Sequence, residues 1–229
     1  MATMSADEQA AEDSTRERLL HGAIRLLSSS GPEALQARKV AAEIGASTMA
    51  VYTHFGGMPQ LVEAMVREGF RRLDRRLAEV AVTEDPVADL FAVGLAYRSH
   101  ALDHPELYRL MFGLTALPGR RGARRDLLSG DGTPTDLAEG QLAFQHLVTA
   151  VSRVIDSGRT RTEDPSRVAA QVWSAVHGYV LLEIAGFFGP DDHGVQQVFL
   201  PLGVNLAIGF GDTPENAARS AALSGVRYR

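Results

Sequence analysis

Residues 37–55 read ARKVAAEIGASTMAVYTHF, and this stretch decides the fold that we expect. Residues 37–44 carry apolar side chains on one face of a short helix, and Gly45 follows where a chain leaving a helix often takes a left-handed turn. Ser47 can then cap a second short helix that runs to about Phe55. Two short helices joined by a glycine turn form a helix-turn-helix unit.

The residues of this unit fit the packing that two crossing helices need. Small residues stand where the helices cross: Ala41, Ala42, Gly45 and Ala46. Val51 and Phe55, one turn apart, can anchor the second helix in a core. The outward positions of that helix are Thr48, Met49, Tyr52 and Thr53. Tyrosine and methionine make a poor solvated face, whereas short polar and apolar side chains suit the major groove of DNA, so we predict a recognition helix.

Longer helices flank this unit. A capping box at Ser14 and Glu17 predicts that a first helix begins at Ser14. Pro59 stands in the first turn of another helix, whose apolar period continues for about six turns. We place the boundary of the N-terminal domain near Thr83, so that this domain covers residues 14–82.

The rest of the chain also has helical periodicity, without the strict alternation that indicates a sheet. The expected helices span residues 87–102, 106–114, 135–156, 165–188 and 195–208. Residues 118–134 have no periodicity and are typical of a mobile loop. We therefore predict an all-α protein with a second helical domain at residues 83–210. Residues 1–13 and 211–229 are expected to be tails, although 214–223 could add a turn or two of helix.

Composition excludes several classes of protein. The chain has 229 residues, 45% hydrophobic and 22% charged, which is ordinary for a globular protein with a core. It has no cysteine, which excludes disulfides, thiolate metal sites and cysteine nucleophiles and fits a reducing cytoplasm. No export signal opens the sequence, and polar residues interrupt the apolar run at 168–188, so we expect no membrane span.

Charge is unevenly distributed along the sequence. Residues 14–80 contain ten Lys and Arg against seven Asp and Glu, a net charge of +3. The whole chain has 23 basic and 28 acidic residues, so the remainder carries −8. A basic segment on an acidic body favours a local contact with a polyanion.

The stretch at residues 37–55 resembles the helix-turn-helix of TetR-type transcriptional repressors. The resemblance covers residues 14–80, and its most specific part is the small-Gly-Ala-Ser sequence followed by Val-Tyr-Thr-His-Phe. It implies an all-helical homodimer whose N-terminal domain binds DNA. The long helix would join that domain to a C-terminal domain that pairs the subunits and binds a small molecule.

The resemblance also assigns DNA contacts residue by residue. Residues that match positions able to reach base edges are Arg38, Thr48, Met49 and Thr53. Residues that match phosphate-holding positions are Ser47, Tyr52 and His54, and we add Lys39 to the candidate DNA contacts. Many members begin the long helix with a lysine, where this chain has Met58 after Gly56-Gly57. The free amides after Gly57 can still hold a phosphate at that helix N-terminus.

Aromatic and polar side chains on the later helices are candidates for an effector pocket, with ordinary core packing as the alternative. These candidates are Tyr97, His100, Tyr108, Met111, Phe112, Phe144, His146, Trp173 and His177. No nucleophile elbow, zinc-binding helix motif or phosphate-cradling loop accompanies them, so we predict neither an enzyme nor a metal or cofactor. Residues 173–178 also resemble a motif of one subgroup of TetR-type C-terminal domains.

These observations together predict a cytoplasmic, sequence-specific transcriptional regulator that is a homodimer on a palindromic operator in double-stranded DNA. We expect a repressor that a small apolar or amphipathic effector releases. The alternative is an all-helical dimeric ligand-binding protein or enzyme that has lost specific DNA binding. The substitution of Met58 for lysine and the modest charge of +3 are the features that favour this alternative.

Overall fold

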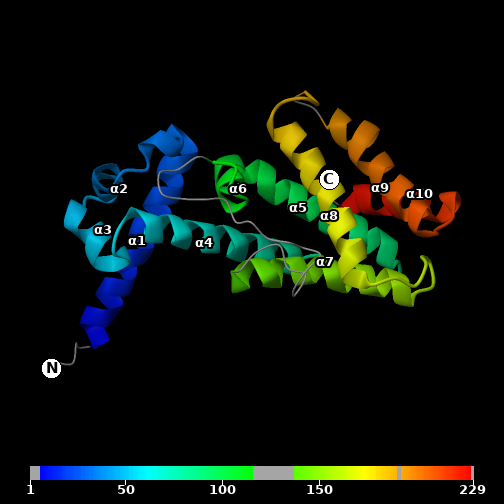
Figure 1. Ribbon diagram of the computed structural model, residues 1–229, viewed down its shortest axis with the longest axis horizontal. Helices are drawn as coiled ribbons and strands as arrows, with labels where there is room; N and C mark the ends of the chain where they lie inside the picture. Colours follow the sequence, from blue (N-terminus) through cyan, green and yellow to red (C-terminus); the bar gives the residue numbers. More distant parts are fainter. Residues whose placement is uncertain (1–5, 116–136, 190–191, 228–229) are drawn as a thin grey trace. The chain divides into compact units, whose positions relative to one another are not determined.

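The computed structural model describes residues 6–115, 137–189 and 192–227, and every regular element in these ranges is a helix (Figure 1). The predicted all-α class is confirmed. The expected loop at residues 118–134 lies outside the described residues. Among the described helices, none is long and apolar enough to cross a bilayer.

The helices form two compact units that divide inside α4 (Met58–Ala78). Unit 1 comprises the described residues of Met1–Gly69 and His104–Ala123, and unit 2 those of Phe70–Asp103 and Arg124–Arg229. The boundary near Thr83 concerns where a DNA-binding domain ends, and it stays a prediction.

Unit 1 contains four complete helices, a short 3-10 turn and the first part of α4. The complete elements are α1 (Ala6–Ser30), η1 (Pro32–Ala34), α2 (Ala37–Glu43), α3 (Thr48–Phe55) and α6 (Pro105–Met111). The prediction that α1 begins at Ser14 was wrong, because the residues before Ser14 are mostly Ala, Glu and Gln, which continue a helix well. Helix α6 ends at Met111, before the expected residue 114, and Gly113 follows with a φ of +70°.

Unit 2 contains the end of α4 and the later helices. These are α5 (Pro86–Asp103), α7 (Ala138–Asp156), α8 (Pro165–Ile184), η2 (Val195–Phe199), α9 (Leu200–Phe210) and α10 (Pro214–Arg227). Helix α8 stops at Ile184 instead of residue 188, because Gly186 takes a φ of +85° and its amide bonds Glu183 O at 2.9 Å. The expected helix at 195–208 begins with a π-helical turn, η2, before α9.

The C-terminal segment, expected to be a tail with at most a turn or two of helix at 214–223, contains the longer helix α10, which packs on α5. Ala217, Ser220, Ala221 and Ser224 are buried there, at 0 to 5% exposure. The helix face consists of small residues and serines, which lack the strong apolar period that indicates a buried helix.

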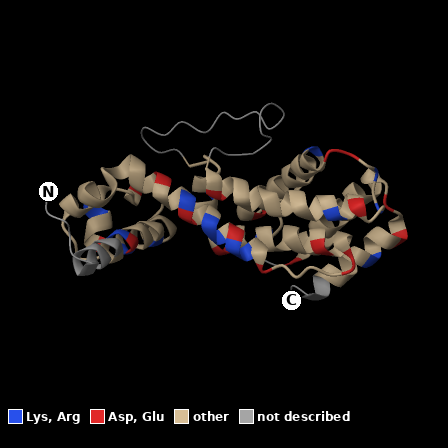
Figure 2. Cartoon of the chain, turned by 90° about the horizontal axis from the view of Figure 1, so that it is seen from below, with Lys and Arg blue, Asp and Glu red and all other residues tan. Residues whose placement is uncertain are grey.

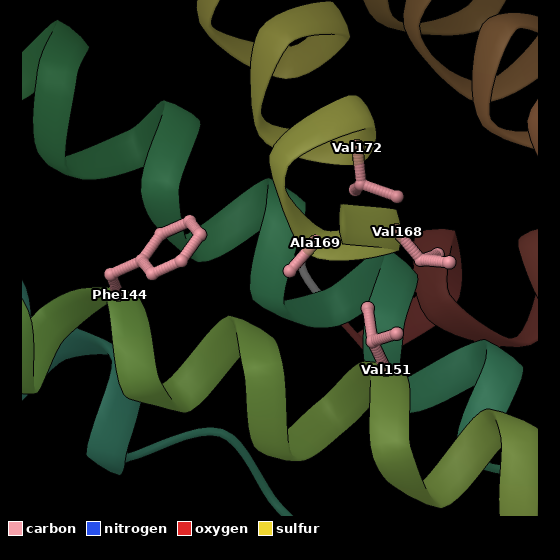
Figure 3. Packing of buried hydrophobic residues seen from close by; sticks show 5 residues of the cluster. All are labelled: Phe144, Val151, Val168, Ala169 and Val172. Atoms are coloured by element: carbon pink, nitrogen blue, oxygen red, sulfur yellow. The ribbon is translucent and has the colours of Figure 1, made fainter. Parts of the chain in front are cut away.

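The core of unit 2 lies between α5, α7 and α8. Figure 3 shows part of it, where Phe144 and Val151 from α7 meet Val168, Ala169 and Val172 from α8. All five side chains are buried. This packing joins α7 to α8 within unit 2.

Candidate nucleic-acid interface and effector cavity

The turn between α2 and α3 has the geometry that the sequence predicts. Gly45 has a φ of +70°, and the amide of Ala46 donates to Ala41 O at 2.9 Å. Ser47 stands at the N-cap of α3 with an extended backbone, but its side chain makes no capping hydrogen bond, so that part of the prediction was wrong. Its hydroxyl is exposed and available to a partner outside the unit.

Buried anchors fix the position of α3 in unit 1. Val51 is 0% and Phe55 8% exposed. The guanidinium carbon of Arg16 on α1 lies 4.8 Å from the centroid of the Phe55 ring, a cation–π contact. Helix α3 therefore cannot turn about its own axis without losing core contacts, and its outer face has a fixed direction.

Helix α1 also holds the end of α2. Arg18 Nη2 donates to the carbonyl oxygen of Ile44 at 2.9 Å, which satisfies a carbonyl at the C-terminus of α2. Arg25 Nε bonds Glu43 Oε1 at 3.3 Å. The two helices approach closely at Gly22, where an added Cβ would lie 2.9 Å from Ile44 Cγ2. The arginines of α1 are thus used within unit 1.

The eight candidate DNA contacts form one accessible set. Met49 is 69% and Tyr52 52% exposed, although both are large side chains with apolar surface. Six of the eight, Arg38, Lys39, Ser47, Thr48, Tyr52 and Thr53, are exposed polar or charged residues, and His54 is half-buried. Within the described part of the chain, these eight side chains make no hydrogen bond or ion pair.

The cations of α2 differ from those of α4. Arg38 and Lys39 have no acidic partner among the described residues. On α4, basic and acidic residues alternate (Figure 2), and Arg67 bonds Glu63 at 2.7 Å. Two cations without an acidic partner in the described part of the chain therefore lie on α2, the helix before α3.

The N-terminus of α4 follows two glycines with positive φ, +78° at Gly56 and +145° at Gly57. The carbonyl of Gly57 accepts the first helical bond, from the amide of Leu61 at 3.2 Å. The amides of the first turn have no helical partner, and Pro59 has no N–H at all. Two amides, those of Met58 and Gln60, are left in this turn for an anion.

Three of the effector candidates meet in unit 2. The hydroxyl of Tyr97 lies 2.9 Å from His177 Nδ1, and Trp173 Nε1 donates to that hydroxyl at 3.2 Å. Burial lowers the pKa of His177 from 6.5 to about 4, so its ring is neutral at physiological pH. The Phe144 ring packs edge-on against Trp173, with centroids 6.4 Å apart.

The other candidates are distributed between the two units. Tyr108, Met111 and Phe112 belong to unit 1, where the rings of Tyr108 and Phe112 pack edge-on at 4.9 Å. His100 is buried on α5, and His146 Nε2 lies 2.9 Å from Asp74 Oδ1.

A separate cavity of about 60 Å³ lies between α5, α7, α8 and α9, and we call it the apolar cavity. Its walls are aliphatic and aromatic, with Thr160 as the polar exception. Phe91 and Phe199 enter from α5 and η2, and Val176 and Leu206 from α8 and α9. None of the nine candidate pocket residues lines this cavity.

Known proteins match both parts of the chain. A family model described as bacterial regulatory proteins, tetR family, matches residues 19–65, and one described as tetracyclin repressor-like, C-terminal domain, matches residues 90–200. The uncharacterised helix-turn-helix transcriptional regulator Rv0681 of Mycobacterium tuberculosis is 27% identical over 208 residues, which are 85% of this chain and 81% of the relative.

The chain belongs to the TetR family.

Solved structures have the same fold. A protein of unknown function from Rhodococcus sp. RHA1 is 25% identical, with a TM-score of 0.68 over 86% of this chain and 96% of its own. RolR in complex with resorcinol is 14% identical, with a TM-score of 0.61 over 93% of this chain and 96% of its own. The latter likeness shows the fold alone.

This TetR-family protein is a DNA-binding transcriptional regulator with effector binding. TetR-family regulators are generally not enzymes. Sequence reasoning missed the residues of the apolar cavity, because valines, leucines and alanines at helical spacing have the same pattern as a filled core. In the structure, Gly94 lies against the Phe199 ring and Gly203 against the Phe91 ring, but the sequence has no signal for these pairings because their members are more than 100 positions apart.

Proposed function

We propose that this TetR-family regulator is a homodimeric repressor that binds a palindromic operator through α2 and α3 and leaves it when a small apolar molecule enters the apolar cavity. The observation that carries the proposal is the set of eight accessible side chains on α2 and α3 with no partner in the described chain. Such groups lose no protein contact when they bind DNA.

Within this set, the resemblance to TetR-type repressors suggests two roles. Thr48, Met49 and Thr53 lie on α3 and Arg38 on α2, and we assign them to base edges. Ser47, Tyr52 and His54, together with Lys39, are assigned to phosphates. Phosphate contacts fix the position of the helix on the duplex, whereas base contacts select the sequence.

A homodimer is supported by the surface of α9 and α8. Helix α9 is almost entirely apolar, yet none of its residues is buried within one chain. On α8, Leu182 is 47% exposed, and Phe187 just after the helix is 74% exposed. A second copy of the chain would cover this surface with the same helices about a two-fold axis.

The apolar cavity supports the choice of effector. Its lining offers dispersion contacts and almost no hydrogen bonds, which selects an apolar ligand. An engineered apolar cavity of about 150 Å³ binds benzene, and this cavity is less than half that size, so we expect it to enlarge when it accepts a ligand. An effector would therefore stabilise an arrangement of α8 and α9 that differs from the one described. Its higher affinity for that arrangement is the differential affinity that a switch requires.

The test is footprinting and titration of the full-length protein on the DNA upstream of its own gene. We expect protection of a palindrome whose half-sites are about one helical turn apart, ~34–36 Å. Ala175→Phe, which fills the apolar cavity from α8, should leave operator affinity nearly unchanged and reduce release by benzene, used as the probe. Equal affinity for the upstream palindrome and for random DNA would favour the alternative, a ligand-binding protein without specific DNA binding.

A further inference from the structure

Unit 2 has a second cavity of about 300 Å³, which shares no residue with the apolar cavity. Its walls come from the end of α4, the segment 80–82, α5 and the outer face of α7. Its volume reaches the lower end of the range that ligand pockets occupy, about 300–1,000 Å³. We call it the polar cavity. We propose that it binds a small organic cation, an amine with an apolar body, whose ammonium group pairs with Asp74.

One ion pair in the wall has no net charge. Arg153 Nη1 donates to Asp89 Oδ2 at 2.7 Å, and the amide and hydroxyl of Thr83 donate to the same carboxylate at 2.8 and 2.7 Å. Burial alone would raise the pKa of Asp89, but these hydrogen bonds lower it below its usual value. Asp89 therefore stays ionised beside a permanent cation, and the two charges cancel.

Asp74 is different, because its charge has no permanent counterpart. Its Oδ1 lies 2.9 Å from His146 Nε2, and a histidine is charged only when it is protonated. In the described part of the chain, Asp74 makes no other hydrogen bond or ion pair. Its side chain is 34% exposed, so Oδ2 can accept a bond from a ligand. The groups of the wall with a permanent charge state are thus two carboxylates, Asp74 and Asp89, against one guanidinium, Arg153, which favours a cation over an anion.

The remaining wall suits an apolar body with polar edges. Val82 is 76% and Leu142 60% exposed at the rim, and an apolar ligand would cover both. Gln145 and Thr149, one turn apart on α7, are exposed and have no hydrogen-bond partner among the described residues. Together these groups are complementary to an amphipathic amine rather than to a metal ion or a purely apolar molecule.

An amine bound in the polar cavity would contact α4 directly. Asp74 and Leu77 belong to α4, the helix that begins three residues after α3 ends. The binding claim itself does not rest on the proposed repressor function, because it is measured without DNA. A failure of operator binding and a failure of amine binding are therefore separate results.

The experiment uses isothermal titration of the full-length protein with three probes of one shape: phenethylamine, phenethyl alcohol and phenylacetate. We expect the amine to bind at least about tenfold more tightly than the alcohol and the carboxylate, a difference of ~1.4 kcal/mol. Asp74→Asn should weaken amine binding by about tenfold or more. Asp156→Asn removes the same charge at the exposed end of α7, outside the cavity, and should change nothing.

A second variant guards against an effect of Asp74 on folding. Thr149→Phe occupies the cavity from an exposed position of α7 and should abolish amine binding while the unfolding temperature stays unchanged. The proposal is overturned if the amine and the carboxylate bind equally, or if either Asp74→Asn or Thr149→Phe binds the amine like the wild type. Loss of amine binding in Ala175→Phe alone would also overturn it, since that result places the amine in the apolar cavity.

Discussion

At the scale of single residues, the proposed DNA contacts of α2 and α3 are of two kinds, to base edges and to phosphates. Changing Thr48 or Arg38 to Ala should cost ~1–3 kcal/mol on the operator and alter the base preference, because these residues are assigned to base edges. Tyr52→Phe and His54→Ala should instead weaken binding to operator and random DNA alike. Competition titrations on both DNAs distinguish the two patterns. Equal losses on both DNAs for all four variants would contradict the assignment.

His177 makes a prediction about pH. Because burial lowers its pKa to about 4, the unfolded chain takes up a proton near pH 6.5 while the folded chain does not. The contribution of His177 to the free energy of unfolding should therefore fall as pH drops, by about 2 kcal/mol between pH 7 and pH 5. In urea titrations at these two pH values, His177→Gln should lose less stability than the wild type. Parallel losses would show that the imidazole is not held neutral.

At the scale of elements, α10 fixes the start of α5 through one hydroxyl. Ser220 Oγ donates to Asp85 Oδ2 at 2.7 Å, and Arg159 Nη2 contacts the same hydroxyl at 3.2 Å. Ser220→Ala removes one hydrogen-bond partner from each of these half-buried charged groups and should cost ~1–3 kcal/mol in urea unfolding. Ser224→Ala is the matched control, because among the described residues that buried hydroxyl has one hydrogen bond, to Ala221 O one turn back. A larger loss in the control would refute the role of Ser220.

How far the elements could be predicted depends on what each one buries. The helix-turn-helix could be predicted because its key residues act locally. Gly45 makes the turn, and Val51 and Phe55 anchor the helix that follows it. Helix α10 was missed because its buried face is alanine and serine. The polar cavity was not predicted either, since it brings together Asp74 and His146, which are 72 positions apart. Apolar periodicity indicates which face of a single helix is buried, but it does not indicate which faces of different helices pack against each other.

At the scale of the whole molecule, the exposed apolar surface of α8 and α9 predicts the oligomeric state. Leu182→Arg puts a charge on this surface without entering the apolar cavity and should convert a dimer to a monomer, with loss of operator binding. Leu223→Arg, at a comparably exposed position of α10, should remain a dimer. Light scattering at micromolar concentration measures both. A monomeric wild type, or a dimeric Leu182→Arg, would contradict the dimer proposal.

The bond from Ser220 to Asp85 also bears on how the protein is made. Its two ends are 135 positions apart, so at about 5–20 residues per second the ribosome needs roughly 7–27 s to supply the second end after the first. During that interval, Asp85 of the nascent chain lacks its hydroxyl partner. The face of α5 that α10 later covers is exposed to water or to a chaperone. The second unit therefore completes its fold only after α10 has been synthesised, and a nonsense mutation before α10 would leave a product in which this face of α5 is bare.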